Sequence, residues 1–239
     1  MFDANAGTME RVLDAALAAG VPRVVAVSTV NAFGNTMGRV VDETYSRDPA
    51  DGFLSAYDES KWLGHVAAER RAMDGAPIVI VQPSQVYGPG DHSEVGGQLR
   101  GAHDGTLPFV GLGGTGLGLV HVDDLAAGII AALDRGRPWR SYVLSGPTVR
   151  IREALAIAAQ VGGHRLPRLS VPDAVLRTGA ALFPNQGGLF GLQPNLREII
   201  SASVGVTYWA SAARAEAELA FRARDLATGF ADTFGARPA

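Results

Sequence analysis

The sequence contains no cysteine, and it contains a single lysine among its 21 basic residues. Without cysteine, a disulfide scaffold and a thiolate metal site are both excluded. The net charge is only -3, so no basic face for nucleic acid is expected. No apolar run reaches the roughly 18 residues that a membrane helix needs, and residues 1–16 carry acidic side chains that a signal peptide lacks. We therefore expect a cytoplasmic protein with neither a membrane nor a nucleic acid as its partner.

The one lysine, Lys61, stands against 20 arginines. Lysine and arginine differ most where a compact ammonium must share or give up a proton. A lysine kept in so arginine-rich a chain points to a position where arginine cannot serve. Chance explains it equally well, since a single lysine must fall somewhere.

The 239 residues, 47% of them apolar, are enough to bury the core of one large domain or slightly more. Apolar residues recur at helical spacing in some segments, and others are continuous runs rich in Val and Ile, typical of strands buried on both faces of a parallel sheet. The predicted helices are 6–19, 56–74, 123–135, 151–161 and, after a looser stretch from 163, 211–219; the predicted strands are 23–28, 78–81, 117–122 and 142–145. This alternation predicts an α/β protein. Asn5 or Thr8 is expected to cap the first helix, and Asp123 or Asp124 the third.

Tyr57 and Lys61 lie four residues apart at the start of a predicted helix, so they share one face. A free tyrosine has a pKa of about 10 and transfers protons poorly at neutral pH. A nearby ammonium favours the phenolate, so we expect Lys61 to lower the pKa of Tyr57 and to make it a proton-transfer group. The alternative is an ordinary Tyr–Lys pair on a helix surface.

Ser28 and Thr29 end the predicted strand 23–28. Ligands of open α/β sheets bind at the carboxyl ends of the strands, where a hydroxyl can hydrogen-bond a substrate oxygen. The alternative is that these hydroxyls satisfy only their own loop. A strand-end hydroxyl followed some 28 residues later by the Tyr57–Lys61 pair is more specific than either feature alone.

Together these motifs resemble those of the extended short-chain dehydrogenases/reductases, the NAD(P)-dependent epimerase/dehydratase family. The matching segments are Asn5 with 12–16, Val27-Ser-Thr-Val-Asn-Ala-Phe-Gly34, Tyr57-Asp-Glu-Ser-Lys61, Gln82-Pro-Ser-Gln-Val-Tyr-Gly-Pro-Gly90 and Leu119-Val-His-Val-Asp-Asp-Leu-Ala126. The resemblance covers nearly the whole chain. Within the family, the subgroup that it resembles is that of the dihydroflavonol-reductase-like and hopanoid-associated sugar-epimerase-like enzymes.

The resemblance implies a Rossmann-like, doubly wound parallel sheet with a smaller α/β substrate-binding region. Residues 1–90, with 117–147 returning to them, would belong to the dinucleotide-binding domain, and 91–239 mainly to the substrate-binding region. It also implies a homodimer joined through helices 6–19 and 56–74.

The resemblance further implies a role for each site residue. Thr29, Tyr57 and Lys61 would be catalytic. The residues that would contact NAD or NADP are Ser28, Tyr57, Lys61, Pro83, Ser84 and Val86. No metal is expected, because the family place of His121, Asp123 and Asp124 is a strand end and a helix cap.

Several features depart from the family pattern. Members open with a strand and a Gly-rich turn that holds the dinucleotide pyrophosphate, and this sequence shows neither. We expect about 80 residues to be absent, through a misplaced start or a true deletion, and we expect this chain alone to bind NAD(P) weakly or not at all. Gly111–Gly116 fits G-x-G-x-x-G but leads into a predicted strand, so a hairpin turn is expected there. His65 replaces a residue that is commonly acidic.

Leu117 is a departure that concerns the substrate. Nucleotide-sugar members usually carry an arginine at this position to pair the diphosphate, which leucine cannot do. A small-molecule substrate other than a nucleotide-diphosphate sugar is therefore implied. The expected activity is NAD(P)-dependent oxidoreduction or epimerisation at a carbonyl or secondary alcohol. The alternative is a truncated, non-catalytic remnant that serves as a binding or dimerisation module.

Overall fold

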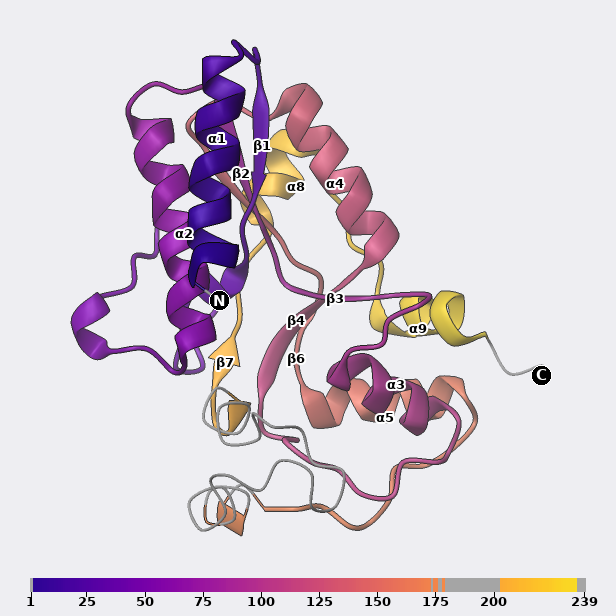
Figure 1. Ribbon diagram of the computed structural model, residues 1–239. Helices are drawn as coiled ribbons and strands as arrows, with labels where there is room; N and C mark the ends of the chain where they lie inside the picture. The colour runs from indigo at the N-terminus through magenta and orange to yellow at the C-terminus, as the bar shows by residue number, and fades with distance from the viewer. Residues whose placement is uncertain (1, 173, 176–177, 179–202, 236–239) are drawn as a thin grey trace. The chain divides into compact units, whose positions relative to one another are not determined.

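The computed structural model describes residues 2–172, 174–175, 178 and 203–235, and strands alternate with helices along it (Figure 1). The helices are η1 (Asp3–Gly7), α1 (Thr8–Ala18), η2 (Val30–Phe33), η3 (Pro49–Asp51), α2 (Ala56–Met73), α3 (Glu94–His103), α4 (Val122–Arg135), α5 (Ile151–Val161), α8 (Ala213–Leu219) and α9 (Leu226–Phe234). The strands are β1 (Val24–Val27), β2 (Ile78–Pro83), β3 (Gln85–Tyr87), β4 (Gly116–His121), β5 (Ser141–Leu144), β6 (Thr148–Arg150) and β7 (Thr207–Tyr208). Within the described ranges, no helix is both long and apolar enough to cross a membrane.

The chain divides into two compact units. Unit 1 comprises Met1–Val86, Gly118–Thr148 and Tyr208–Arg224; unit 2 comprises Tyr87–Leu117, Val149–Thr207 and Asp225–Ala239. The sequence pattern assigned 208–224 to the substrate-binding region, but this segment folds with unit 1 because Ala215, Leu219 and Phe221 join its core.

The sheet of unit 1 has the order β1–β2–β5, and both of its pairings are parallel, as predicted. Val24 is in register with Ile78, and Val81 with Tyr142. Every residue of the central strand β2 is buried, which explains its unbroken apolar run from Ile78 to Val81. A second sheet has the order β3–β4–β6, with β7 beside β4.

Helices cover both faces of the first sheet, as in a doubly wound protein (Figure 1). On one face α1 and α2 pack through a cluster that contains Leu13, Ala68 and Ile80. On the other face α4 and α8 pack through a cluster that contains Ala132 and Leu219. The carboxyl ends of β1 and β2 are therefore held by a core that is closed on both sides.

Unit 2 contains a small helical layer in which α5 packs against both α3 and α9. The ring of Tyr87 meets that of Phe230 edge to face, with ring centroids 5.1 Å apart. Residues 111–115 contain a turn and lead into β4 and not into a helix. The predicted hairpin is wrong, because Val110 before the turn forms a parallel bridge with Ser170 and does not pair with β4.

The predicted helix caps are wrong. Neither Asn5 nor Thr8 caps the first helix with its side chain. His121 caps α4 by accepting a hydrogen bond from Asp123 N, and Asp124 instead pairs with Arg224, whose Nη2 lies 2.7 Å from Asp124 Oδ1. Asp124 therefore pairs with a residue 100 positions away and does not cap its own helix.

Candidate active site

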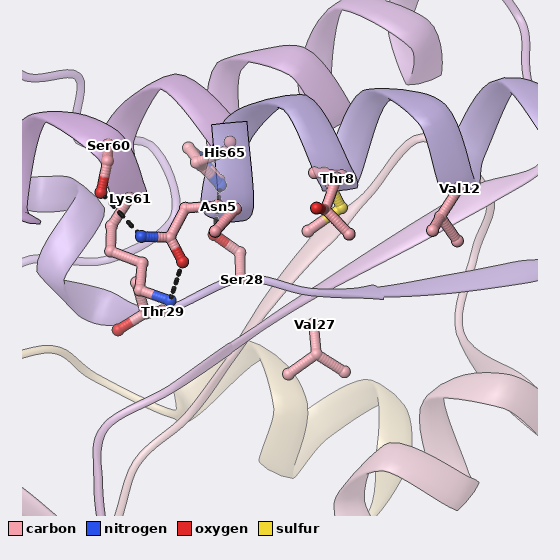
Figure 2. Close-up of a pocket in the computed structure, with 12 residues that line it drawn as sticks. Asn5, Thr8, Val12, Val27, Ser28, Thr29, Ser60, Lys61 and His65 are labelled. Carbon is pink, nitrogen blue, oxygen red and sulfur yellow. Dashed lines mark hydrogen bonds between the residues drawn. The ribbon is translucent and has the colours of Figure 1, made fainter. Parts of the chain in front are cut away.

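An open pocket of about 280 Å3 lies in unit 1, where the end of β1 meets η1, α1 and α2 (Figure 2). Its walls are formed by Ala4, Asn5, Thr8, Met9, Val12, Val27, Ser28, Thr29, Ser60, Lys61, Gly64 and His65. Three of the site residues expected from the sequence, Ser28, Thr29 and Lys61, are brought together here. Tyr57, Pro83, Ser84 and Val86 are not among the residues that line it.

The side chain of Lys61 enters the pocket from the second turn of α2. This helix begins at Ser55, whose Oγ accepts a hydrogen bond from Asp58 N over 3.0 Å. Lys61 is half-buried, and its Nζ donates to Asn5 Oδ1 over 3.1 Å. The remaining N–H groups of the ammonium are available to a ligand.

Asn5 joins the turn η1 to helix α2. Its Nδ2 donates to Ser60 Oγ over 2.9 Å while its Oδ1 holds Lys61 (Figure 2). Ser60 in turn donates to the carbonyl oxygen of Tyr57 over 2.8 Å. The sequence offered Asn5 only as a cap and as part of a family motif, because a contact across 56 residues leaves no local signal.

Tyr57 lies one turn before Lys61 and is 43% exposed. Lys61 Nζ is 5.3 Å from the centroid of the Tyr57 ring. Burial of the phenol raises the pKa of Tyr57 above its ordinary value, so the lowering expected from Lys61 is wrong for the chain without ligands. The ammonium of Lys61 is hydrogen-bonded to Asn5. The direction of the shift in the pKa of Tyr57 is therefore determined by the phenol's loss of hydration.

Ser28 and Thr29 have hydroxyls in different environments. Ser28 Oγ lies 3.0 Å from His65 Nδ1, whereas Thr29 Oγ1 accepts a hydrogen bond from Asn31 N and so caps η2. The contact of Thr29 is the local one that strand-end hydroxyls commonly make. Its own O–H can still donate to a ligand.

A buried ion pair anchors the start of α2 beside Tyr57. The guanidinium of Arg47 binds both oxygens of Asp58, at 2.9 Å and 2.8 Å, and the two side chains are only 8% and 4% exposed. Gly34, with φ at +70°, lets Arg47 approach, since a Cβ there would lie 2.8 Å from the guanidinium carbon. Burial raises the pKa of Tyr208; the charge of Asp58 raises this pKa further, and that of Arg47 lowers it. No motif in the sequence pointed to this pair.

The carboxyl end of β2 holds the remaining expected cofactor contacts. Pro83 and Ser84 are buried, and Val86 packs against the core of unit 1. Both amide atoms of Gln82 and the hydroxyl of Ser84 are buried without a hydrogen-bond partner in the described parts of the chain. Buried polar atoms are seldom left so, and at this edge of an α/β sheet they are suited to a ligand.

The site thus combines an anchored ammonium, a protonated phenol and two strand-end hydroxyls. An ammonium suits ribose or carbonyl oxygens, and a phenol can exchange a proton with a reacting oxygen. Neither group is a strong nucleophile at neutral pH, which favours proton transfer over covalent catalysis.

Comparison with known proteins gives a consistent result. Residues 1–145 match the NAD dependent epimerase/dehydratase family. A putative dihydroflavonol 4-reductase of Synechocystis is 31% identical over 180 residues, which cover 72% of this chain and 51% of the relative. Sterol demethylase protein B of Methylococcus capsulatus is 27% identical over 192 residues, covering 76% and 55%. The chain therefore spans about half the length of these curated relatives.

Solved structures with the same fold are numerous. The crystal structure of gox2253 superimposes with a TM-score of 0.80 at 28% identity, covering 98% of this chain and 71% of that one. A dTDP-glucose 4,6-dehydratase from Streptomyces venezuelae, solved with NAD bound, gives a TM-score of 0.70 at 24% identity, covering 98% and 65%. The second likeness concerns the fold alone.

Proposed function

Because the chain belongs to the NAD-dependent epimerase/dehydratase family, we propose that it carries the proton-transfer centre of an NAD(P)-dependent oxidoreductase or epimerase acting on a carbonyl or secondary alcohol. The single observation that carries the proposal is Lys61, held by Asn5 in a pocket that it shares with Ser28 and Thr29. NAD(P) would supply the hydride.

The residues present fit such a cofactor. Lys61 uses one of its N–H groups on Asn5, which leaves others for ribose hydroxyls. Ser84 and Gln82 offer buried polar atoms that lack partners, at the strand end where α/β proteins bind nucleotides. Ser28, Tyr57, Pro83 and Val86 complete the proposed contacts. Titration with both nucleotides distinguishes NAD from NADP.

The protein groups would act on the proton and not on the hydride. Tyr57, whose pKa is raised by burial, stays protonated at neutral pH and donates its proton to the reacting oxygen when a carbonyl is reduced. Thr29 donates a hydrogen bond to that oxygen, since its own oxygen already accepts from Asn31. The ammonium of Lys61 stabilises the phenolate that Tyr57 becomes after it donates its proton, and Asn5 keeps the ammonium in place.

The proposed substrate is a small molecule of low polarity and not a nucleotide-diphosphate sugar. Leu117 stands where diphosphate-binding members carry an arginine. The relatives named for dihydroflavonol reduction and sterol demethylation fit this, because neither name denotes a nucleotide-diphosphate sugar.

The test is a titration of the chain with NAD+, NADP+ and their reduced forms, followed by 1H–15N correlation spectra. We expect shifts at Asn5, Ser28, Thr29 and Lys61. A panel of secondary alcohols and ketones is then assayed for nicotinamide turnover with wild type and Tyr57→Phe. Shifts without turnover would favour the binding module, and neither shifts nor turnover sensitive to Tyr57 would refute the proposal.

A further inference from the structure

Helix α2 and the end of β1 form a hydrogen-bonded chain that the reaction above does not use. Ser28 Oγ lies 3.0 Å from His65 Nδ1 (Figure 2). On the other side of the imidazole, His65 Nε2 lies 3.3 Å from Glu69 Oε1. Lys61, His65 and Glu69 are spaced four apart and therefore lie on one face of α2. The imidazole is almost fully buried, at 7% exposure, and the carboxylate reaches solvent.

The charge on Glu69 decides which nitrogen of His65 carries the proton. Hydrogen bonding with His65 holds the pKa of Glu69 below its ordinary value, so this carboxyl group is ionised at neutral pH. An ionised carboxylate only accepts, which places a proton on Nε2. When the imidazole is neutral, Nδ1 has a lone pair and no proton, and the Ser28 hydroxyl must donate to it.

A hydroxyl that donates to His65 turns its lone pairs towards the pocket. Resting on the function proposed above, we infer that His65 and Glu69 are positioning residues that make Ser28 a hydrogen-bond acceptor, so that the pocket selects the alcohol form of its substrate over the carbonyl form. Thr29 has the opposite polarity, because its oxygen already accepts from Asn31 and its O–H is left to donate. At this strand end, Ser28 thus accepts a hydrogen bond from a ligand and the adjacent Thr29 donates one.

Protonation of His65 reverses the role of Ser28. The imidazolium donates from both nitrogens, which releases the Ser28 proton for a ligand carbonyl. The charged or titratable groups nearby are Lys61 and Glu69 on the same helix, whereas the pocket walls from η1 and α1 contribute Asn5, Thr8 and Met9, which do not titrate.

The tautomer of His65 is directly measurable in the chain without any ligand. We would label the five histidines with 15N, record long-range 1H–15N spectra, and assign the His65 signals by their loss in His65→Gln. The Nε2–H tautomer is expected for the neutral imidazole, with more of the Nδ1–H form in Glu69→Gln. An Nδ1–H tautomer in the wild-type chain would overturn the inference, whatever the activity.

Ligand selection is tested with cyclohexanol and cyclohexanone, followed through the amide signals of Ser28 and Thr29. One hydrogen bond should give the alcohol an advantage of about fivefold in Kd at pH 8. We expect this advantage to shrink on acidification, to vanish at every pH in His65→Leu, and to persist in the control His92→Gln, whose side chain is exposed in unit 2. A merely structural role for His65 would leave the pH dependence in place.

The two proposals fail in different ways. If cyclohexanone binds the wild-type chain as tightly as cyclohexanol, the inference is wrong while the pocket remains a substrate site. If neither compound shifts the pocket residues, the proposed function fails, and the inference that depends on it fails with it.

Discussion

The phenol of Tyr57 keeps its proton at neutral pH, because burial raises its pKa. As a proton donor it is active in the protonated form, so the rate of carbonyl reduction at saturating substrate should be insensitive to pH around neutrality. The rate should fall only as the pH rises through the pKa of Tyr57, above about 10. Oxidation of the alcohol needs the deprotonated phenol and should rise over the same range. A decline in reduction already below pH 9 would show that Lys61 lowers this pKa in the working enzyme.

Replacing Tyr57 by phenylalanine removes a single hydroxyl. We expect turnover to fall by at least about 100-fold, the usual contribution of a proton-transfer group. The melting temperature should hardly change, since the side chain is 43% exposed. The measurement is steady-state kinetics together with a thermal melt, and a variant that keeps most of its turnover would remove Tyr57 from the mechanism.

Lys61→Arg tests the compact ammonium at the place where Asn5 holds it. A planar guanidinium cannot occupy the same position between Asn5 and Tyr57, so we expect turnover to drop by an order of magnitude or more with the fold retained. Arg71→Lys, the reverse exchange at a surface ion pair further along α2, is the control and should be silent. Near-full activity of Lys61→Arg would mean that the single lysine is there by chance.

The buried pair Arg47–Asp58 should matter more for stability than any surface pair. Asp58→Asn leaves the Arg47 charge buried without a counter-ion, and we expect it to lower the free energy of unfolding by about 3–5 kcal/mol. The double variant Arg47→Met, Asp58→Leu should recover part of this loss. Urea unfolding gives the values, and Arg11→Ala, which breaks an exposed pair with Asp3, should cause no measurable change.

At the scale of secondary-structure elements, helix α3 contains two adjacent glycines in opposite environments. A Cβ on Gly96 would lie 2.3 Å from Asp91 Oδ2, whereas a Cβ on Gly97 meets nothing within 4 Å. Gly97→Ala should therefore stabilise the protein by about 1 kcal/mol, the difference in helix propensity, and Gly96→Ala should destabilise it. Thermal melts of the two variants decide this, and equal shifts would contradict the packing described for Asp91.

Elements with strong local signals were predictable from the sequence. Helix α5 has the predicted bounds, and α2 ends one residue before its predicted end. The strands β1, β2 and β5 and their parallel pairing were predicted from short apolar runs, whereas their order in the sheet was not. The cap of α4 was not predictable, because the choice among His121, Asp123 and Asp124 depends on Arg224, which is 100 residues away.

In the candidate site, too, the local patterns were predictable and the contacts between distant segments were not. The Tyr57–Lys61 spacing and the strand-end hydroxyls are local patterns, so the sequence contains them. The partners that orient these groups come from distant segments: Asn5 for Lys61, Arg47 for the start of α2, and Ser28 for His65. Such contacts exist only after the chain has folded, and no spacing rule finds them.

At the scale of the whole molecule, β1 forms an edge of the three-stranded sheet, and Val27 on it is 47% exposed. An apolar edge with unpaired backbone groups favours pairing with another chain. We expect the 239-residue chain to self-associate, and Val27→Lys to shift it towards the monomer in size-exclusion chromatography with light scattering.

The proposed dimer through residues 6–19 and 56–74 should respond to substitutions differently from association through the edge of β1. It should be insensitive to a charge on the strand edge and sensitive to one on the helix face, which Met73→Lys supplies at a residue that is 79% exposed. A stable monomer of the wild-type chain would exclude both modes of association.

Lys61, whose half-buried ammonium lies in the pocket, is the only lysine in the sequence. A lysine-specific endoprotease therefore has one side-chain target, and the bond after Lys61 lies inside α2, where the intact helix resists cleavage. Cleavage requires that this part of α2 open, so its rate under native conditions reports the opening of the helix that carries Tyr57, Lys61 and His65. An amine-acylating reagent likewise has one side chain to modify, and protection of it by a bound nucleotide would act as a footprint of the pocket at a single atom.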